Sequence, residues 1–269
     1  MKKLKLVALA TLAVLTSFTF TACDKNQDDN GNNNNNEKAT IHIMLTDAPA
    51  VYDAVFVDVQ QVQLHSETEG WIEVPVANPG VYNLLELSNG MDTLLGTCEF
   101  PAGTLSQVRL ILGDNNYVVV DSVSYPLTVP SGSTSGLKLN VHEVIEGGYT
   151  YTFWLDFDAA QSIHVTGNGK YMLKPVIRMY AETSSGSVEG YVYPAEALPQ
   201  VSVYNDQDTL MALPDSLGYY KISGIPAGTY MVEFKSLLDT LPYGSQSLID
   251  VQVVNGQTLQ LEPITLILP

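Results

Sequence analysis

Three aspartates are the first candidates for binding chemistry in this chain. Asp156 and Asp158 lie two residues apart in a predicted strand, so their carboxylates project from one face of it. Asp47 lies where another predicted strand meets a proline-directed turn. Carboxylates are the ligands that calcium prefers, but no EF-hand or repeat spacing surrounds them. The alternatives are a turn cap at Asp47 and a solvated sheet face at Asp156 and Asp158.

Other signatures of catalysis or metal binding are missing from the sequence. The histidines, which are His42, His65, His142 and His164, have no pair at zinc-ligand spacing. There is no Gly-x-Ser-x-Gly elbow and no phosphate loop. Cys98 has no histidine near it in sequence to act as a base, which favours a buried small side chain over a nucleophile. We expect no catalytic residues, cofactor or metal, and a hydrolase assembled from distant loops is the alternative.

Aromatic side chains are the remaining candidates for ligand contact. The chain has fifteen tyrosines and two tryptophans, and such rings anchor protein interfaces and offer flat apolar faces to sugars. Trp154 shares a predicted strand face with Thr150 and Thr152, so it is our first candidate ligand-binding residue. The alternative is that these rings pack across neighbouring strands.

The N-terminal segment has the layout of a secretory signal. A basic start precedes an apolar run without charge at residues 6–20, and small residues then lead to Cys23. The run is short for a membrane span and lacks a basic flank on its far side. Residues 20–23 (Phe-Thr-Ala-Cys) resemble the bacterial lipobox, with Phe20 where leucine is usual. The resemblance implies that residues 1–22 are a removed lipoprotein signal peptide. It also implies that acyl chains such as palmitate on Cys23 anchor the protein in a membrane.

Residues 23–38 are predicted to be a disordered tether. They are rich in asparagine and acidic residues and have almost nothing apolar to bury. Asp28 and Asp29 resemble an export signal that places some lipoproteins on the outer face of the outer membrane, and the alternative is that they only solvate the tether. We therefore expect a cell-envelope location, on the outer membrane and exposed at the surface.

The charge of the chain excludes some partners. The formal net charge is −17, and removal of the three lysines in the signal takes it to −20. Nucleic acids and anionic lipid surfaces are bound mainly through Lys and Arg. We expect no nucleic-acid partner, and contact with the membrane only through the lipid on Cys23.

Alternating apolar residues dominate the chain from residue 40 onward, as is typical of strands with one buried face. Four such runs are Ile41/Ile43/Leu45, Val55/Val57/Val59, Val108/Leu110/Leu112 and Leu137/Leu139/Val141. In the second run the phase slips at Gln60 and Gln61, after which Val62 and Leu64 are apolar. The slip predicts a β-bulge, with a polar break between two strands as the alternative.

One segment has helical spacing. Its leucines are Leu84, Leu85, Leu87, Leu94 and Leu95, interrupted at Asn89 and Gly90. Two short helical turns joined at this pair are predicted, and an irregular crossover is the alternative. The expected class is therefore all-β, with two tandem β-sandwich domains of Greek-key type and a short helical segment in the first.

A small polar stretch at residues 182–187 predicts a boundary between domains at 39–182 and 187–269. The second part contains, in order, Asp215, Gly218, Tyr220, Ile222, Ile225, Pro226, Gly228, Tyr230 and Val232. This order resembles the carboxypeptidase regulatory-like module, a transthyretin-like sandwich, and departs from it at Pro199 and Gln200, where a glycine-alanine turn is usual. The resemblance implies a spacer or binding scaffold and brings no catalytic residues. Asn255 and Gly256 predict a hairpin turn near the end of the module.

The first domain resembles domain-of-unknown-function family 4382 over about residues 39–180. Three blocks carry the resemblance, at residues 45–49 (Leu-Thr-Asp-Ala-Pro), 107–112 and 156–177. It implies an exported β-rich lipoprotein domain and brings no binding residues with it.

The function expected from these observations is a non-catalytic cell-envelope lipoprotein. It would present two β-sandwiches for structural roles or for contact with a protein or a glycan. The alternative is a fimbria-type polymer subunit joined by strand exchange, which would need a removable strand after the lipid. A calcium-dependent adhesin and a hydrolase are further alternatives.

Overall fold

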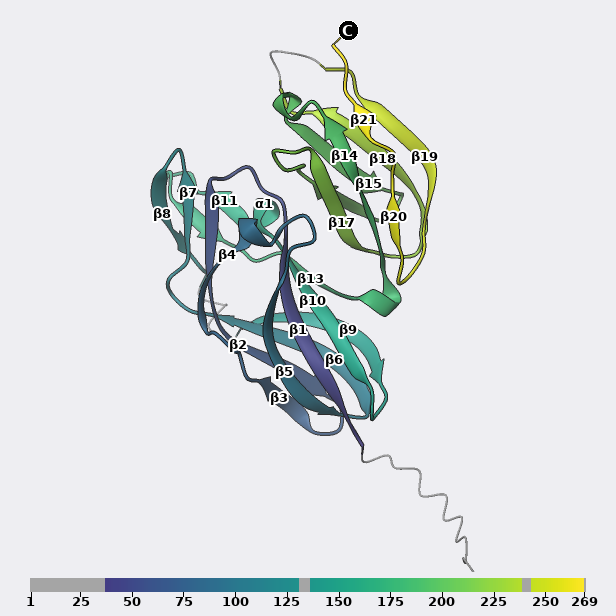
Figure 1. Ribbon diagram of the computed structural model, residues 1–269. Helices are drawn as coiled ribbons and strands as arrows, with labels where there is room; N and C mark the ends of the chain where they lie inside the picture. Colours follow the sequence, from purple (N-terminus) through teal and green to yellow (C-terminus); the bar gives the residue numbers. More distant parts are fainter. Residues whose placement is uncertain (1–36, 131–135, 239–242, 269) are drawn as a thin grey trace, which may run out of the picture. The chain divides into compact units, whose positions relative to one another are not determined.

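The computed structural model describes residues 37–130, 136–238 and 243–268. Cys23, the signal segment and most of the predicted tether lie outside these residues. The described residues form one compact unit, in which the strands build two β-sandwiches with separate hydrophobic cores (Figure 1). The predicted fold class is confirmed. Within the described ranges, no helix is long and apolar enough to cross a membrane.

The first sandwich begins with a four-stranded sheet in which the first strand of the described chain is central. Its order is β13-β10-β1-β5. The strands are β1 (Lys38–Ala48), β5 (Thr93–Pro101), β10 (Thr150–Asp158) and β13 (Ile177–Ala181). Strand β1 runs parallel to β10 and antiparallel to β5, so both of its edges are hydrogen-bonded. Parallel pairing needs a long crossover, here the whole chain between β1 and β10.

A nine-stranded sheet forms the other layer, in the order β11-β12-β8-β7-β2-β6-β9, with β3 and β4 also paired to β2. Its strands are β2 (Ala54–Ser66), β3 (Gly70–Val74), β4 (Gly80–Asn83), β6 (Gly103–Leu112), β7 (Tyr117–Val120), β8 (Val123–Thr128), β9 (Leu137–Ile145), β11 (Ile163–Val165) and β12 (Tyr171–Leu173). The register of β2 against β6 shifts between Val59 and Gln61. The predicted bulge is confirmed, since β2 is one unbroken strand.

The apolar positions of the predicted alternation form the core of the first sandwich. Ile41, Ile43 and Leu45 of β1 are fully buried, as are Val55 and Val57 of β2. They pack in one cluster with buried residues of β6 and β10, because the apolar faces of the two sheets meet.

The helical prediction is half right. Leu84–Leu87 form a 3-10 helix, η1, but Leu94 and Leu95 belong to strand β5. Asn89 and Gly90 both have positive φ, at 55° and 83°, so they reverse the chain into a strand and not into a second helical turn. A single turn of α-helix, α1 (Ala159–Ser162), follows β10.

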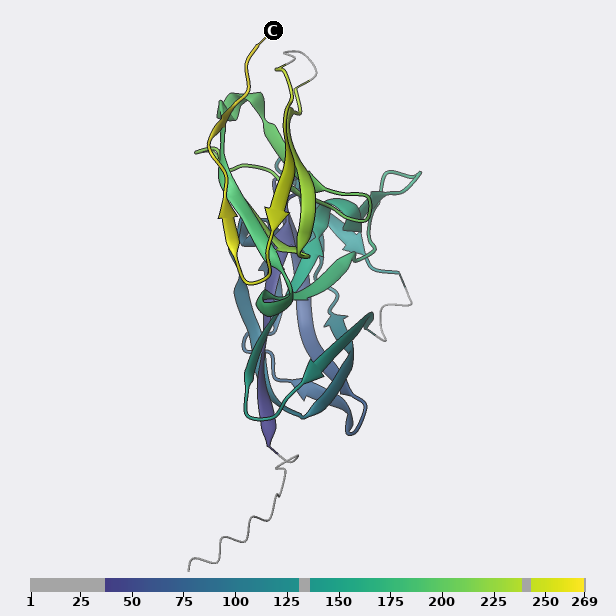
Figure 2. The same ribbon diagram turned by 90° about the vertical axis from the view of Figure 1, so that its right-hand side faces the viewer.

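The second sandwich has two four-stranded sheets, ordered β17-β14-β20, with β21 also paired to β14, and β16-β15-β18-β19 (Figure 2). Its strands are β14 (Gly186–Tyr193), β15 (Pro199–Tyr204), β16 (Thr209–Ala212), β17 (Tyr219–Ile225), β18 (Gly228–Ser236), β19 (Gln246–Val253), β20 (Thr258–Gln260) and β21 (Ile264–Thr265). Two 3-10 turns, η3 (Glu182–Ser184) and η4 (Ala195–Ala197), flank β14. Tyr220 and Phe234 are fully buried in its core.

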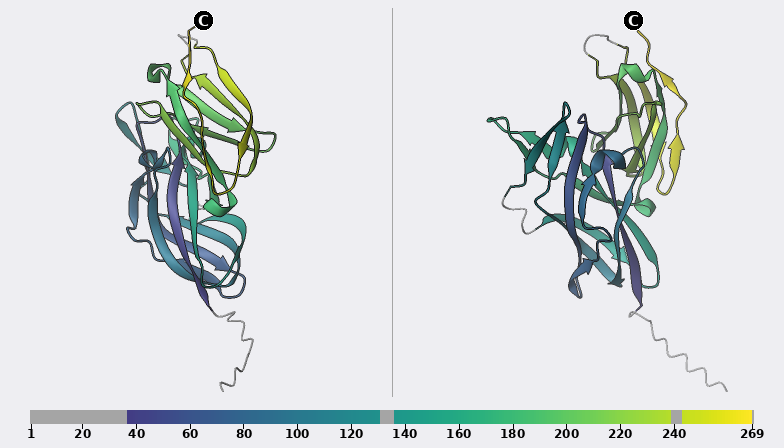
Figure 3. Two further views of the ribbon diagram at one scale, coloured as in Figure 1. Left: turned by 45° about the vertical axis from the view of Figure 1, so that its right-hand side comes forward. Right: turned by 60° about the vertical axis from the view of Figure 1, so that its left-hand side comes forward.

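The turn at Asn255 and Gly256 differs from the predicted hairpin. It joins β19, which pairs with β18, to β20, which pairs with β14, so it crosses between the two sheets. The last strands, yellow in Figure 3, run parallel to β14. Strands β8 and β12 also pair in parallel. Greek-key patterning alone predicts antiparallel sheets, whereas these sandwiches contain both kinds of pairing.

Candidate functional site

Two adjoining cavities lie where the outer face of the β13-β10-β1-β5 sheet meets strand β17. Their volumes are about 180 and 170 Å³. They share five lining residues, which are Thr46, Gly90, Tyr180, Lys221 and Ser223. We call the pair of cavities the junction cleft, since its walls come from both sandwiches.

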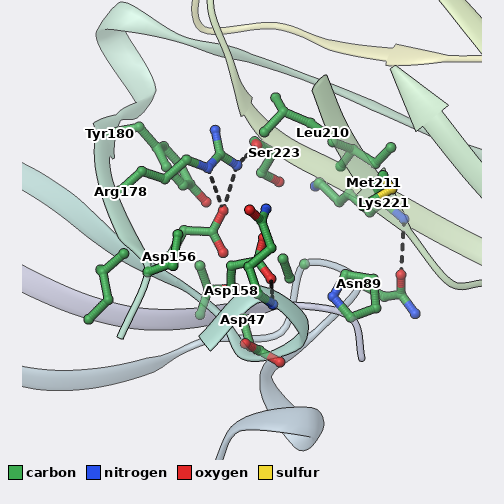
Figure 4. A pocket seen from close by; sticks show the side chains of 18 of the residues that line it. Asp47, Asn89, Asp156, Asp158, Arg178, Tyr180, Leu210, Met211, Lys221 and Ser223 are labelled. Carbon is green, nitrogen blue, oxygen red and sulfur yellow. Dashed lines mark hydrogen bonds and ion pairs between the residues drawn. The ribbon is translucent and has the colours of Figure 1, made fainter. Parts of the chain in front are cut away.

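The side chain of Arg178 joins the two walls of the junction cleft. Its Nη2 lies 2.5 Å from Oδ2 of Asp156, and its Nε donates to the same oxygen at 2.7 Å (Figure 4). Nη1 and Nη2 also donate to the main-chain oxygens of Gly224 and Ser223, at 2.6 and 2.8 Å. Burial raises the pKa of the Asp156 carboxyl, and the guanidinium opposes that rise. One planar cation therefore neutralises a buried acid and satisfies two carbonyl groups of β17.

Tyr180 lies on the same strand face as Arg178 and is covered by the backbone of β17. A Cβ atom on Gly224 would approach Cγ and Cε1 of the Tyr180 ring to 2.7 Å, so only glycine allows this contact. Gly224 also has a φ of +69°, a conformation that favours glycine. Burial is the main cause of the raised pKa of the Tyr180 hydroxyl.

The turn between η1 and β5 forms a second bridge to the second sandwich. Nδ2 of Asn89 donates to the carbonyl oxygen of Leu213 at 3.0 Å, and the main-chain N–H of Lys221 donates to Oδ1 of Asn89 at 3.5 Å (Figure 4). The hydroxyl of Thr46 lies 2.9 and 3.0 Å from the carbonyl oxygens of Leu87 and Met91. This hydroxyl fixes the turn against β1, so the Asn89 amide is held in place.

Trp154, the candidate named from the sequence, lines the smaller cavity. It is half-buried and lies opposite Tyr180 in the β10–β13 ladder, with ring centroids 5.6 Å apart and planes within 6° of parallel. Its indole N–H donates to Oδ2 of Asp92 at 2.7 Å. The indole therefore has a fixed orientation on the cavity wall.

The three aspartates considered for calcium all line the larger cavity, but their carboxylates have separate roles. Asp156 pairs with Arg178, and Asp158 caps α1 by accepting from the N–H of Gln161 at 2.8 Å. Oδ1 of Asp47 accepts from the N–H of Ala159 at 3.1 Å, while the Asp47 carboxylate points away from Arg178 (Figure 4). Over the described part of the chain, no group of three or more His, Cys, Asp or Glu side chains could hold a metal ion.

The burial of Asp47 and Asp156 corrects two expectations. Asp156 is 7% exposed and lies under β17, so its face of the sheet is not solvated. Asp47 is 5% exposed and caps α1, not its own turn. Its Oδ2 is buried without a hydrogen-bond partner among the described residues, and burial raises the pKa of this carboxyl well above its usual range.

A comparison with protein families matches the model "Domain of unknown function (DUF4382)" to residues 38–175, just over half of the chain. The chain belongs to the DUF4382 family. The match ends before β13, so Trp154, Asp156 and Thr46 lie inside the DUF4382 region. Arg178, Tyr180 and all of the second sandwich lie beyond it. A search of curated proteins found no match to this DUF4382 chain.

Solved structures give only distant likenesses to the DUF4382 chain. A type II cohesin–X-dockerin complex from Acetivibrio cellulolyticus is 23% identical over 30% of this chain and 56% of the other, with a TM-score of 0.25. The shaft pilin SpaA from Lactobacillus rhamnosus GG is 9% identical over 87% of this chain and 99% of its own, with a TM-score of 0.21. The major pilin subunit BcpA of Bacillus cereus is 10% identical over 87% and 71%, with a TM-score of 0.22. The chain thus spans just over half the length of the cohesin–dockerin chain that it matches.

The histidines and Cys98 of the DUF4382 chain lie apart from the junction cleft. His42 hydrogen-bonds Thr97, and His65 hydrogen-bonds Ser106 and packs edge-on against Trp71. Cys98 is free and packs against the first core, and burial raises its pKa to about 11. A thiol with so high a pKa is a poor nucleophile at neutral pH, as expected for a packing residue.

Sequence reasoning missed most of the junction cleft. It named Trp154 and the three aspartates of the larger cavity, but not Asp92, Tyr180, Arg178 or Lys221. One signal was present, because Arg178 is one of only two arginines in an acidic chain and sits in a short strand. An arginine at such a position is a candidate partner for a buried carboxylate.

Proposed function

We propose that this DUF4382 protein is a non-catalytic cell-envelope lipoprotein that presents its two β-sandwiches for binding. The observation that carries the proposal is the junction cleft, whose walls come from both sandwiches and whose polar groups converge on two cavities. Concave sites with a few convergent polar groups are the usual places for ligands. The ligand is a protein segment or a glycan.

The anchor in this proposal is the lipid on Cys23. The basic start, the apolar run and the lipobox-like residues 20–23 support it. Metabolic labelling with palmitate tests it, because wild-type protein should take up label and a Cys23→Ser variant should not. Unlabelled wild-type protein that begins at another residue would contradict the anchor.

The second sandwich serves as a scaffold, in line with its resemblance to the carboxypeptidase regulatory-like module. Its turns are held by local side chains, which support that role. Oδ1 of Asp215 accepts from the N–H groups of Leu217 and Tyr219, and the Tyr230 hydroxyl donates to the carbonyl oxygen of Pro226. These contacts fix the loops that flank β17, the strand that forms one wall of the cleft.

Capture from envelope extracts tests the binding role. Glu182 is exposed and lines the smaller cavity, while Glu196 is exposed on η4 outside both cavities. Binding through the cleft predicts that wild-type and Glu196→Arg proteins capture the same protein or glycan and that Glu182→Arg loses it. Equal capture by all three proteins would place binding elsewhere and overturn the proposal.

A second candidate, the fimbria-type polymer subunit, is favoured by the position of β1. This strand is the first described element after the predicted tether, and Ala39, Ile41, Ile43 and Leu45 on it are buried. Its loss would open a groove between β5 and β10 that a strand from another copy could fill.

The loop after β1 allows the polymer hypothesis to be tested. Val51 in this loop is 75% exposed, so a specific protease site placed at residues 50–52 would be accessible. Cleavage there should yield ladders of polymers if strand exchange occurs. Cleaved protein that keeps β1 bound, or that unfolds without forming polymers, would exclude this candidate.

A further inference from the structure

The cavity wall that holds Trp154 combines a fixed aromatic pair with polar groups of both hydrogen-bonding types. From this we propose that the smaller cavity binds one sugar ring of a neutral oligosaccharide. The inference rests on the proposed binding function and names its ligand class.

The aromatic pair is not explained by core packing. Trp154 and Tyr180 belong to neither hydrophobic core, yet their rings are stacked and oriented. Asp92 holds the indole N–H, and the backbone at Gly224 covers Tyr180. A ring whose orientation is fixed before the ligand arrives costs little conformational entropy on binding. Such rigid apolar surface suits the C–H groups of a sugar ring.

The polar groups around the rings match sugar hydroxyls. Asp92 and Glu182 supply carboxylate oxygens, which accept hydrogen bonds. Lys221 adds a donor to the same wall, and its ammonium group lies 3.7 Å from Oε2 of Glu189. The amide of Gln257 both donates and accepts hydrogen bonds. A hydroxyl needs one donor and one acceptor as neighbours, so this mixture can pair vicinal hydroxyls that an apolar cavity would leave unpaired.

Charge and size narrow the ligand further. Two carboxylates on the wall disfavour phosphate, sulfate or acidic sugars, because the charge of Lys221 is shared with Glu189. The cavity of about 170 Å³ is smaller than the roughly 300 to 1,000 Å³ typical of drug-sized ligands, so it suits a single ring. The adjoining cavity of about 180 Å³ leaves room for a neighbouring residue of the same oligosaccharide.

The two tryptophans of the chain allow a direct measurement. Trp71 lies outside both cavities, under the guanidinium of Arg109 at 3.9 Å from the ring centroid. In a Trp71→Phe variant Trp154 is the only indole, and in Trp154→Phe only Trp71 remains. Each variant is titrated with neutral oligosaccharides of glucose, galactose, mannose and xylose while indole fluorescence is recorded. Calorimetry of the wild-type protein with the same sugars measures affinity.

The site predicts a saturable change of fluorescence in Trp71→Phe with at least one of these oligosaccharides and no change in Trp154→Phe. Asp92→Asn keeps the size of the side chain but removes a charged acceptor, so it should weaken the affinity about tenfold. Absence of any saturable change in Trp71→Phe, together with no heat from the wild-type protein, would overturn the sugar assignment. If Glu182→Arg then still abolished capture of a protein, the binding role would stand with a protein ligand. If no sugar bound and Glu182→Arg captured the same partner as wild-type protein, the proposed binding function of the cleft would be overturned as well.

Discussion

Arg178 and Asp156 face each other across strands β13 and β10, with Nη2 and Oδ2 2.5 Å apart. The Asp156 side chain is 8% exposed and the Arg178 side chain is 35% exposed. The acid is therefore buried, while the arginine keeps partial contact with water. The same guanidinium reaches two carbonyl groups of β17. One arginine of the first sandwich therefore does two things: it neutralises the buried Asp156 carboxylate, and it hydrogen-bonds the second sandwich.

Removal of the guanidinium should destabilise the protein strongly. Arg178→Ala leaves a buried carboxylate and two carbonyl oxygens without their donor, for which about 3 kcal/mol of lost unfolding free energy is expected. Arg178→Lys keeps the charge but not the planar fork, so it should recover only part of the loss. Urea unfolding measures both variants. A loss below about 0.5 kcal/mol in Arg178→Ala would mean that water or another cation replaces the guanidinium.

The close approach of β17 to Tyr180 can be isolated with two glycine variants. Gly224→Ala meets both an unfavourable φ of +69° and the Tyr180 ring, whereas Gly169→Ala meets only a φ of +77°, with nothing within 4 Å of the new Cβ. Each should lose about 1 kcal/mol to backbone strain. Gly224→Ala should lose about 1 to 3 kcal/mol more, because the added methyl group overpacks against the ring. Equal losses in thermal or urea unfolding would show that the ring moves aside freely.

Asp47 should make stability depend on pH. Burial raises its pKa well above its ordinary value of about 3.8, so the folded protein holds this proton more tightly than the unfolded chain. Its destabilising effect is absent below pH 3.8 and grows as pH rises towards the folded pKa. Asp47→Asn should therefore raise the free energy of unfolding at neutral pH and change it little near pH 4. Asp206→Asn, at an exposed turn, is the matched control. A loss of stability in Asp47→Asn at neutral pH would show that the charged form is the favoured one.

Calcium should not stabilise the protein. Asp156 is paired with Arg178 and Asp158 caps α1, so neither carboxylate is free for a cation that needs about six to eight oxygens. Thermal melting with millimolar calcium and with a chelator should give the same Tm. A calcium-dependent rise in Tm would restore the calcium-adhesin alternative.

The sequence predicts the strands better than it predicts the cleft, for a physical reason. Burial of one strand face follows from alternation, so Ile41, Val55 and the bulge after Val59 were foreseen from local residues alone. The burial of Asp156 depends on Arg178, 22 residues away, and on Ser223, a further 45 residues along the chain. Pairings at such separations leave no local pattern. Leu94 and Leu95 failed differently, since their spacing fits a helix but the left-handed conformations of Asn89 and Gly90 turn the chain into β5.

The placement of β1 gives the first sandwich a mechanical property. If the protein is held at Cys23, as we propose, tension on the tether enters at the N-terminal end of β1 and acts along the strand. Hydrogen bonds to β5 on one edge and to β10 on the other would then be loaded together in shear, and could not be peeled apart one at a time. Because both edges of β1 are paired, the first sandwich would resist drag at the strand to which the tether transmits it.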